Sequence, residues 1–385
     1  MGLGTGNDNR GQDEVVQPIE QHDAPPSLPP IEGEVSSVLA VDVPTACAGE
    51  TRTVSFENDQ EVKVQSITNA TIVGERYPIV FVSPQGLPTA VRDSHLIRPN
   101  LSFDAQNNLD SSWSVPDSEV VKLETPVVFL AGPGADNFYH WMHDCIPRLL
   151  VAEKAGIDAP ILVPPASDKN AFIRDSLKLL GIPDDKIIEF PGGKVEAPEV
   201  WVPEDLFHVN PDQVHHSLLN EVRDRLLSAL DLGTQSKGEN RVFLSREGAG
   251  TTRTLVNHAE IETLLVEENG FRKVRMEDLP LEEQIRTIAD ASEIVAPHGA
   301  GLFHTLFMSG GKVIELFPQH PDRHSDPGKK LVEPCWFRIL AAHQERGRSV
   351  QWNQCDCEVE MLSDTDFSQY RLIVSKSDLE SRLAI

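Results

Sequence analysis

A glycine-containing turn between two apolar runs is the first feature that could do chemistry. Residues 292–318 read as a strand, the turn His298-Gly299-Ala300-Gly301, a short helix and a second strand. The glycines remove side chains where the backbone turns, and the free N–H groups of the following helix point to the same place. Such a turn can bind an anion, most naturally a diphosphate, and His298 could donate to a phosphate or sugar oxygen. A tight strand–helix connection without a ligand would explain the same residues.

An acidic residue in the second apolar run is harder to explain without a partner. Glu315 lies in the strand predicted over 312–317, where its neighbours are apolar. A buried carboxylate needs hydrogen-bond donors, and the two hydroxyls of a ribose are suitable ones.

Two arginines follow the first strand of the same half. Ser245 and Arg246 stand at the carboxyl end of the strand predicted over 241–246, and Arg253 lies in the loop before the helix that Asn257 begins. Because strand ends share one edge of a parallel sheet, both guanidinium groups could neutralise a diphosphate without metal. The alternative is a pair of solvated surface arginines.

A third cluster lies on a helix predicted in the other half of the chain. His140 and Asp144 are four residues apart, so they share one helical face, with His143 beside them and Arg148 one turn further on. A histidine and a carboxylate held together can act as a general base or bind a metal. Pro147 should kink or restart the helix. An ordinary amphipathic helix is the alternative.

The elements that must position these groups alternate between strand and helix. The apolar periodicity predicts an α/β fold with two parallel, Rossmann-type units, which places ligands at the carboxyl ends of the strands. Strands are predicted over 125–132, 159–164, 186–190, 199–202, 241–246, 271–276, 292–297 and 312–317, and helices over 137–156, 168–180, 212–230, 257–269, 281–290 and 302–308. Short β-type runs between 50 and about 120 predict a β-rich lead-in.

Composition limits the partners. The net charge of −26 over 385 residues argues against general binding to nucleic acid or to an anionic membrane surface. No run of 18 apolar residues exists, and the first residues lack the basic and apolar regions of a signal peptide. With five scattered cysteines, which we interpret as reduced thiols, this predicts a cytoplasmic protein, at most peripheral to the inner face of a membrane through a protein partner.

The order and spacing of the motifs resemble glycosyltransferase family 61. The chain reads N-x-Y-H-W-x-x-D-x-x-P-R-L from Asn137, S-R from Ser245 with N-x-x-E from Asn257, E-Q-I around Gln284, H-G-A-G-L from His298 and V-I-E-L-F-P around Glu315. The resemblance covers roughly residues 60–350. After H-G-A-G-L the family commonly has Thr-Asn, whereas this chain has Phe303-His304. Because of this difference, the resemblance does not indicate which sugar or base is contacted at Phe303 and His304.

The resemblance implies a GT-B-like fold, in which two Rossmann-type domains face a cleft, and inversion at the anomeric carbon. The implied division is a disordered acidic, proline-rich tail (1–45), an acceptor-side domain with the β-rich lead-in (46–232), a nucleotide-sugar-binding domain (233–354) and a C-terminal tail with a helix (355–385). Because this sequence shows no anchor or signal, it resembles the bacterial capsular or exopolysaccharide members most closely in style.

The resemblance matches the following residues to positions in the family's motifs. Their catalytic roles are a hypothesis: Asp144 is expected to be the base, with His140 orienting it or sharing the role, because both come from the half opposite the donor site. The predicted catalytic residues are Asp144, as base, and His140; the predicted supporting residues are Asn137, Arg148, Ser245, Asn257 and Gln284; and the predicted donor-binding residues are Arg246, Arg253, His298, Gly299, Ala300, Gly301 and Glu315. Arg148, Arg246 and Arg253 are expected to converge on one cleft. No metal site is predicted, since the one D-x-D, Asp364-Thr365-Asp366, lies in the predicted tail.

The expected function is inverting transfer of a sugar from a nucleotide-sugar donor, UDP-linked, to a glycan or lipid-linked glycan acceptor in capsule or polysaccharide biosynthesis. No cofactor is required, a divalent metal is not expected to assist, and polysaccharide-assembly proteins are candidate partners. The alternatives are a non-catalytic nucleotide- or glycan-binding protein and a sugar-nucleotide epimerase. A dehydrogenase is disfavoured because no strand is followed by G-x-G-x-x-G.

Overall fold

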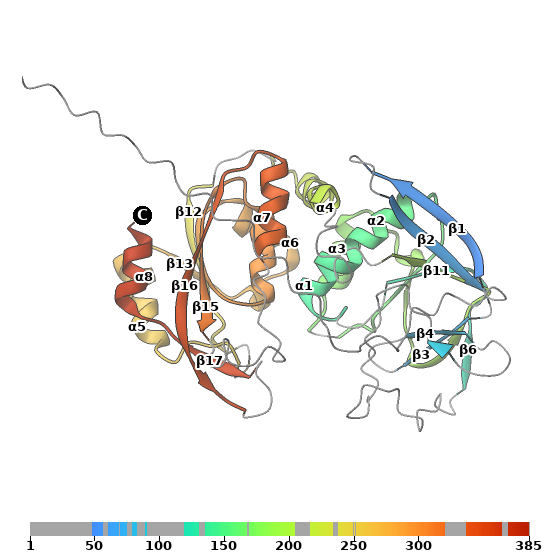
Figure 1. The fold of residues 1–385 in the computed structure, drawn as a ribbon, viewed down its shortest axis with the longest axis horizontal. Coiled ribbons are helices and arrows are strands. Elements are labelled where there is room, and N and C mark those ends of the chain that lie inside the picture. Colours follow the sequence, from blue (N-terminus) through green and yellow to red (C-terminus); the bar gives the residue numbers. More distant parts are fainter. Residues whose placement is uncertain are drawn as a thin grey trace, which may run out of the picture. The chain divides into compact units, whose positions relative to one another are not determined.

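The computed structural model describes most of the chain from residue 48 onward. The described ranges are 48–56, 61–68, 70–74, 79–82, 89–90, 119–130, 135–167, 169–204, 216–233, 238–248, 250, 252–319, 336–363 and 369–384. The predicted tail over 1–45 and the Asp364-Thr365-Asp366 segment lie outside them. Within these ranges the protein is a mixed α/β structure with three sheets, two of them rich in parallel strands (Figure 1). The GT-B arrangement of two domains stays a prediction.

The first sheet joins the β-rich lead-in to the first predicted α/β unit. Its order is β1-β2-β11-β7-β8-β9. The last four strands are parallel, and β2 pairs antiparallel with both β1 and β11. Their bounds are Ala48–Ser55 (β1), Glu61–Thr68 (β2), Val127–Phe129 (β7), Ile161–Val163 (β8), Ile187–Glu189 (β9) and Glu199–Pro203 (β11). Strands β7 and β8 are buried along their whole length, as expected for parallel strands covered on both faces.

A second, five-stranded sheet packs against one face of the first. Its order is β5-β4-β3-β10-β6, with bounds Ala70–Gly74 (β3), Ile79–Val82 (β4), Thr89–Ala90 (β5), Val120–Lys122 (β6) and Gly193–Glu196 (β10). An apolar cluster that includes Ile72, Val195, Phe129 and Val200 joins the two sheets. Strand β10 was not predicted, because its sequence Gly-Lys-Val-Glu carries one buried apolar residue, Val195.

The third sheet belongs to the C-terminal half and has the order β13-β12-β14-β15-β16-β17. The first five strands are parallel and β17 is antiparallel. Their bounds are Asn240–Leu244 (β12), Arg272–Val274 (β13), Ala291–Pro297 (β14), Gly311–Gln319 (β15), Val350–Met361 (β16) and Tyr370–Ile373 (β17). In chain order this is the doubly wound order 2-1-3-4-5 plus one antiparallel strand, with its switch point between β12 and β14.

The prediction of a C-terminal tail from residue 355 onward is wrong, because part of this segment belongs to the third sheet. Residues 355–361 continue β16, so the boundary placed after residue 354 falls inside a strand, and β17 extends the sheet further. The sequence analysis predicted neither strand: the alternation of apolar and polar residues in β16 does indicate a half-buried strand, so β16 was recognisable, whereas β17 is only four residues long. The terminal helix was predicted correctly, as α8, Lys376–Leu383.

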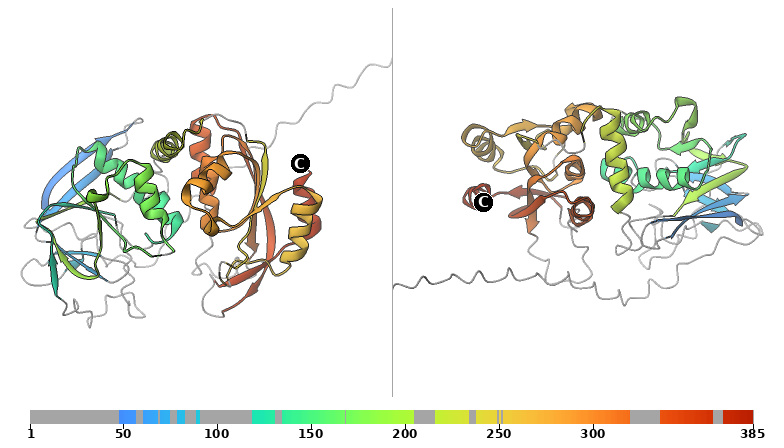
Figure 2. Two further views of the ribbon diagram at one scale, coloured as in Figure 1. Left: turned by 180° about the vertical axis from the view of Figure 1, so that it is seen from behind. Right: turned by 90° about the horizontal axis from the view of Figure 1, so that it is seen from above.

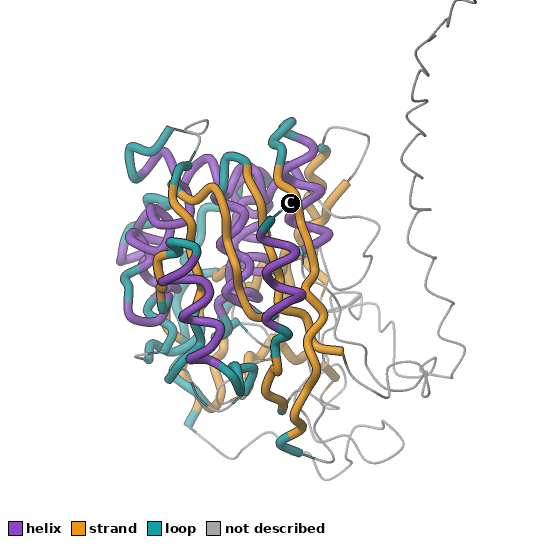
Figure 3. Tube along the Cα trace, turned by 90° about the vertical axis from the view of Figure 1, so that its left-hand side faces the viewer, coloured by secondary structure: helices purple, strands orange, loops and turns teal. Residues whose placement is uncertain are grey.

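Helices cover both faces of the third sheet (Figures 1 and 3). One face packs on α5 (His258–Glu262), the π-helix η5 (Thr263–Glu268) and α8, around Phe243, Ile314 and Leu379. The other face belongs to a larger apolar cluster that continues into the first sheet. The helices contributing to this cluster are α1 (Phe138–His140), the π-helix η3 (Trp141–Cys145), α2 (Ile146–Lys154), α3 (Phe172–Leu179), α4 (His216–Ala229), α6 (Leu281–Ala289), the 3₁₀ helix η7 (Ala300–Phe307) and α7 (Trp336–Glu345).

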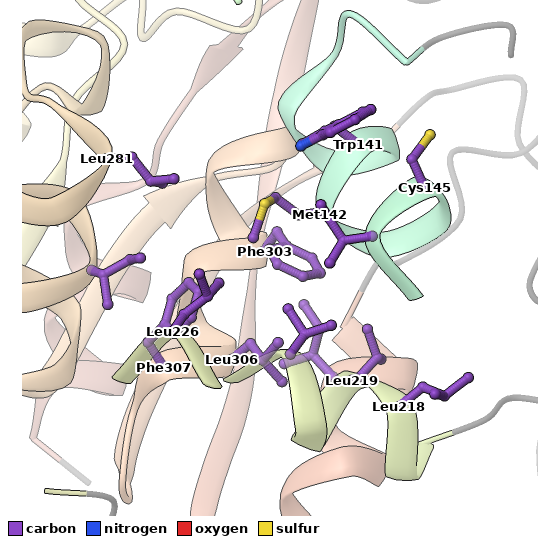
Figure 4. Packing of buried hydrophobic residues seen from close by; sticks show 14 of the residues in the cluster. Trp141, Met142, Cys145, Leu218, Leu219, Leu226, Leu281, Phe303, Leu306 and Phe307 are labelled. Atoms are coloured by element: carbon purple, nitrogen blue, oxygen red, sulfur yellow. The ribbon is translucent and has the colours of Figure 1, made fainter. Parts of the chain in front are cut away.

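Phe303 lies at the centre of that cluster (Figure 4). In the close-up Met142 of η3 lies beside its ring, and Leu219 of α4 belongs to the same cluster (Figure 4). Helices α2 and α4, far apart in the sequence, lie side by side in the ribbon views (Figures 1 and 2). The predicted helix over 137–156 is therefore present as α1, η3 and α2, with Pro147 in the first turn of α2, where proline is tolerated. Two 3₁₀ turns, η4 (Asp184–Lys186) and η6 (Met276–Asp278), complete the elements.

Gly311, which begins β15, gives a stability prediction. Its φ is +117°, and an added Cβ would collide with the backbone of Ser292 on β14, whose carbonyl carbon would be 2.8 Å away. Gly311→Ala should lower the free energy of unfolding by about 3 kcal/mol or more, because backbone strain and overpacking add. Urea unfolding measures the loss. Gly270→Ala is the control, since Gly270 has φ +69° but no atom near its missing Cβ; an equal loss in both variants would contradict the collision.

Candidate functional site

A pocket lies at the switch point of the third sheet, where β12 and β14 diverge. Its volume is about 670 Å³, within the range of small-molecule sites. The carboxyl ends of both strands contribute, through Ser245 and Arg246 after β12 and through Pro297 on β14. Both predicted domains line it, as the full set of residues shows: Phe138, Lys169, Ala171, Phe172, Asp175, Leu244, Ser245, Arg246, Gly248, Gly250, Met276, Glu277, Leu279, Pro280, Leu281, Gln284, Ala296, Pro297, Gly301 and His304.

Two guanidinium groups meet at the glycine turn beside this pocket. A Cβ added to Gly299 would lie 3.3 Å from Nη1 of Arg246 and 3.4 Å from Nη1 of Arg253. With φ at +148°, Gly299 also has a backbone conformation that favours glycine. The sequence prediction that both arginines reach the turn is therefore consistent with the geometry, and glycine is needed there for space and for conformation.

Arg246 forms no ion pair within the described residues, although the charge of Glu277 offsets part of the effect of Arg253 on its pKa. The Nε atom of Arg246 is buried and has no hydrogen-bond partner among the described residues. Within the same residues, Arg253 also forms no ion pair. Burial, and then the neighbouring Arg253, lower the pKa of the Arg246 guanidinium. Arg253 has a φ of +58°, and its backbone N–H donates to the carbonyl of Tyr370 on β17. The fold thus holds two like charges together, an arrangement that an anion would stabilise.

His298 and Glu315 form a pair in the core beneath the turn. Nδ1 of His298 donates to Oε1 of Glu315 over 2.7 Å, and Trp352 Nε1 of β16 donates to Oε2 over 3.1 Å. Glu315 is fully buried. The expectation that Glu315 binds ribose hydroxyls is therefore wrong: its two oxygens already accept from protein donors. It orients His298, whose Nε2 lies on the opposite side of the ring.

The segment after the turn is the 3₁₀ helix η7 instead of an α-helix beginning at 302. It starts at Ala300, and the N–H of Leu302 donates to the carbonyl of Gly299, so one donor that was expected to face an anion is used within the turn. Gly301 lines the pocket. The arginine pair, more than the helix start, therefore supplies the positive charge.

The position at which the chain departs from the family pattern lies on the pocket wall. Nδ1 of His304 lies 2.9 Å from the carbonyl oxygen of Gly301 and Nε2 lies 2.7 Å from Oε1 of Gln284, and the neutral ring donates from one of these two nitrogens. Burial lowers the pKa of His304 to about 4, against the opposing effect of the Gly301 carbonyl. Its ring stacks on Phe138, with centroids 4.2 Å apart. Gln284, predicted as a supporting residue, also donates to the carbonyls of Met276 and Leu279, so it fixes the loop that borders the pocket.

The cluster on η3 forms as predicted, with a third participant. His140 Nδ1 donates to Oδ2 of Asp144 over 2.8 Å, and His143 Nδ1 donates to Oδ1 over 2.6 Å. The side chain of His140 is 36% exposed, that of Asp144 11% and that of His143 0%. Asn137 begins this region by accepting the N–H of Tyr139. His140 is thus the accessible member of a dyad that a buried carboxylate orients.

Three supporting predictions have structural roles. Arg148 is buried and its Nε donates to the carbonyl of Pro203 at the end of β11. Arg148 is not one of the neighbours of Gly299, where Arg246 and Arg253 meet, so the expected three-arginine cluster is a pair. Of the three arginines, only Arg246 lines the pocket. Asn257 connects α5 to β17 by exchanging hydrogen bonds with the backbone of Val374, and it also donates to Glu260. Ser245 is the third; it contacts His258 and lines the pocket.

One group of three potential metal ligands occurs in the described ranges, Glu247, His258 and Glu262. The ammonium of Lys273 lies 2.6 Å from Glu247 and 2.8 Å from Glu262, so a protein cation already neutralises both carboxylates. This donor set does not fit a divalent ion without displacing Lys273.

Sequence reasoning missed the pocket wall contributed by the N-terminal half. Phe138 and Phe172 meet edge to face there, with centroids 5.4 Å apart, and Asp175 lies near them on α3. Phe138 falls inside the N-x-Y-H-W motif, a signal that could have been used. Nothing in the local sequence marks α3 as a pocket element, because its position depends on tertiary packing.

Comparison with known proteins identifies the region that contains these groups. Residues 138–314 match the family model "Glycosyltransferase 61". The protein O-linked-mannose β-1,4-N-acetylglucosaminyltransferase 2 of Homo sapiens is 30% identical over 114 residues, covering 26% of this chain and 20% of that protein. The same enzyme of Canis lupus familiaris is 29% identical over 209 residues, covering 49% and 35%.

The similarity is partial in extent. The chain spans about a fifth to a third of the length of these relatives. Both carry an N-acetylglucosaminyltransferase name, so nothing in these matches supports the expected place among bacterial capsular enzymes.

Proposed function

We propose that this chain, whose residues 138–314 match the glycosyltransferase 61 family model, transfers N-acetylglucosamine from UDP-N-acetylglucosamine to a glycan hydroxyl with inversion at the anomeric carbon. The family match supports glycosyl transfer, and the names of the relatives support this sugar. Capsule biosynthesis is not part of the proposal. A cytoplasmic location stays a prediction; no helix in the described ranges is long and apolar enough to cross a membrane.

The observation that carries the proposal is the pair of arginines that meets at Gly299, beside a switch-point pocket that Arg246 lines. A diphosphate beside Gly299 would receive hydrogen bonds from Arg246 and Arg253 and would neutralise their mutual repulsion. The same groups would stabilise the charge that develops on the diphosphate as the sugar leaves. The nucleoside and sugar would extend into the pocket, which has apolar walls at Met276 and Phe172.

The acceptor hydroxyl needs a base, and the geometry favours His140 over Asp144. Asp144 receives both histidines on its two oxygens and is mostly buried, whereas His140 is the more exposed of the three. In this proposal His140 removes the acceptor proton and Asp144 orients its ring and stabilises the imidazolium that forms. This exchanges the roles that were predicted from the sequence.

The test combines binding with turnover. UDP-N-acetylglucosamine at about 100 times its dissociation constant should stabilise the full chain by about 2.7 kcal/mol in thermal unfolding. UDP should appear only when an acceptor, such as mannose O-linked to a peptide, is present, and EDTA should leave the rate unchanged. Binding of the donor without turnover would support a non-catalytic protein. Turnover of the donor without an acceptor would support an epimerase or a hydrolase. Absence of binding would overturn the donor assignment.

A further inference from the structure

A ribose in the pocket needs a hydrogen-bond acceptor from the protein. Glu315 does not provide it, because both of its oxygens already accept from protein donors. Two carboxylates occur among the described residues that line the pocket, those of Glu277 and Asp175. Asp175 belongs to α3 in the N-terminal half, whereas Glu277 lies in η6, directly after β13 of the third sheet. Glu277 is therefore the carboxylate on the side of the pocket that carries Arg246.

The order of the strands places Glu277 next to Arg246. Strand β13 pairs in parallel with β12, with Val274 opposite Leu244, so the carboxyl ends of the two strands lie at the same edge of the sheet. Arg246 comes shortly after β12, and Glu277 comes shortly after β13. In doubly wound nucleotide-binding sheets the phosphates lie after the first strand, and an acidic residue further along the chain accepts from a ribose hydroxyl. Glu277 has the position that such an acid needs.

The guanidinium of Arg275 holds this carboxylate by one of its oxygens. Nε and Nη2 of Arg275 each lie 3.2 Å from Oε1 of Glu277, and Nη1 lies 3.4 Å from Oδ2 of Asp278. The same guanidinium packs against the loop after β12, since a Cβ added to Gly248 would lie 3.2 Å from Nη2. No described residue donates a hydrogen bond to Oε2 of Glu277. This second oxygen can accept from a ligand.

The charges at this edge of the sheet indicate which part of a ligand Glu277 would contact. A carboxylate repels a diphosphate, so Glu277 favours binding only if it accepts from a neutral group of the same ligand. Burial and then Arg253 lower the pKa of Arg246, and the charge of Glu277 opposes them, so Glu277 is within electrostatic reach of the diphosphate site. The ribose is joined directly to the diphosphate and presents two adjacent hydroxyl groups. It is the neutral donor nearest to the phosphates.

We infer that Glu277 binds the ribose hydroxyls of the nucleoside diphosphate through Oε2, while Arg275 holds its Oε1. This inference rests on the proposed function, since it needs the diphosphate beside Arg246. Glu277 would then make the protein specific for ribonucleotides. A ligand without these hydroxyls leaves Oε2 near the diphosphate with no donor, which combines a lost hydrogen bond with an uncompensated repulsion.

The experiment compares the dissociation constants of UDP and 2′,3′-dideoxy-UDP, which lacks both hydroxyl groups, by calorimetry on the full chain at neutral pH. The wild type should bind the dideoxy analogue at least about tenfold more weakly than UDP, the loss of a hydrogen bond to a charged group. Glu277→Ala should bind UDP about tenfold more weakly than the wild type does, and it should bind the two ligands almost equally. Differences in sugar conformation between the ligands are common to both proteins and cancel in this double comparison.

Asp278→Ala is the matched control, because Asp278 is an exposed acid that pairs with the same Arg275 but is not among the pocket-lining residues. It should keep the wild-type ratio between the two ligands. A loss in Glu277→Ala that is equal for both ligands would mean that Glu277 acts only through charge or structure, and it would overturn the inference. A wild-type chain that does not distinguish the ligands would overturn it as well. Should Glu277→Ala fail to fold, Glu277→Gln decides by the same ratio. If the wild type does not bind UDP, the proposed function fails instead.

Discussion

Replacing Asp144 by asparagine is expected to lower sugar transfer by about a thousandfold or more and to change the affinity for UDP-N-acetylglucosamine less than about twofold. The amide has nearly the same shape, but it presents one acceptor and one donor to two histidine N–H groups that now share a carboxylate. His140 would then lose its orientation and the negative charge that stabilises its protonated form, a loss of the order that general base catalysis contributes. Initial rates and calorimetric binding measure the two effects.

Two further variants make this result specific. Asp158→Asn applies the same substitution to an exposed acid that pairs with Lys186, and it should leave transfer unchanged. His140→Ala should be as inactive as Asp144→Asn, and added imidazole should restore part of its activity only if His140 is the base. If the Asp144→Asn protein is active, the proposed roles of His140 and Asp144 are wrong. If imidazole does not restore activity to the His140→Ala protein, Asp144 is the better candidate for the base.

Replacing Arg246 or Arg253 by alanine should weaken UDP binding by about 10- to 100-fold, since each substitution removes a hydrogen bond between charged groups. Transfer, measured as kcat/KM, should fall further, by about a thousandfold, because the same guanidinium stabilises charge that grows as the sugar leaves. Lysine should not substitute well at either position, since it cannot present two parallel donors to a diphosphate. The double variant should lose less than the product of the single losses, because the two groups share one ligand.

Arg272→Ala is the matched control, because Arg272 is an exposed arginine on β13 of the same sheet. It should bind UDP as the wild type does. Equal losses in Arg272→Ala and Arg246→Ala would reduce the arginine pair to a general electrostatic effect, and wild-type binding by Arg246→Ala would remove the diphosphate from this turn.

Local patterns were sufficient to predict many of the elements, though not β10, β16 or β17, and the groups at the ends of β12 and β14. The runs around Val127, Ile161 and Val295 are continuous and apolar, so they were recognisable as buried parallel strands. The meeting of Arg246 with Gly299 followed from a topological rule, since the carboxyl ends of adjacent parallel strands share an edge. The His140–Asp144 contact followed from helical spacing alone.

Contacts between distant segments could not be predicted in the same way. The partner of Glu315 is Trp352, 37 residues later on a strand that the sequence analysis did not predict. Arg148 and its acceptor at Pro203 are separated by 55 residues, and a basic residue in a motif gave no sign that it would be buried. Ser245 was singled out for its motif, but its contact with His258 depends on how α5 packs against β12.

The crowding of Arg246 and Arg253 at Gly299 has a consequence for how this protein can be engineered. Among the described residues neither guanidinium forms an ion pair, and Arg253 lowers the pKa of Arg246. Under the proposed function, the diphosphate of the donor relieves this repulsion. A laboratory selection for thermal stability alone would therefore favour neutral side chains at positions 246 and 253. The selected variants would be more stable but inactive. Stabilising this protein without loss of activity therefore requires that Arg246 and Arg253 are kept.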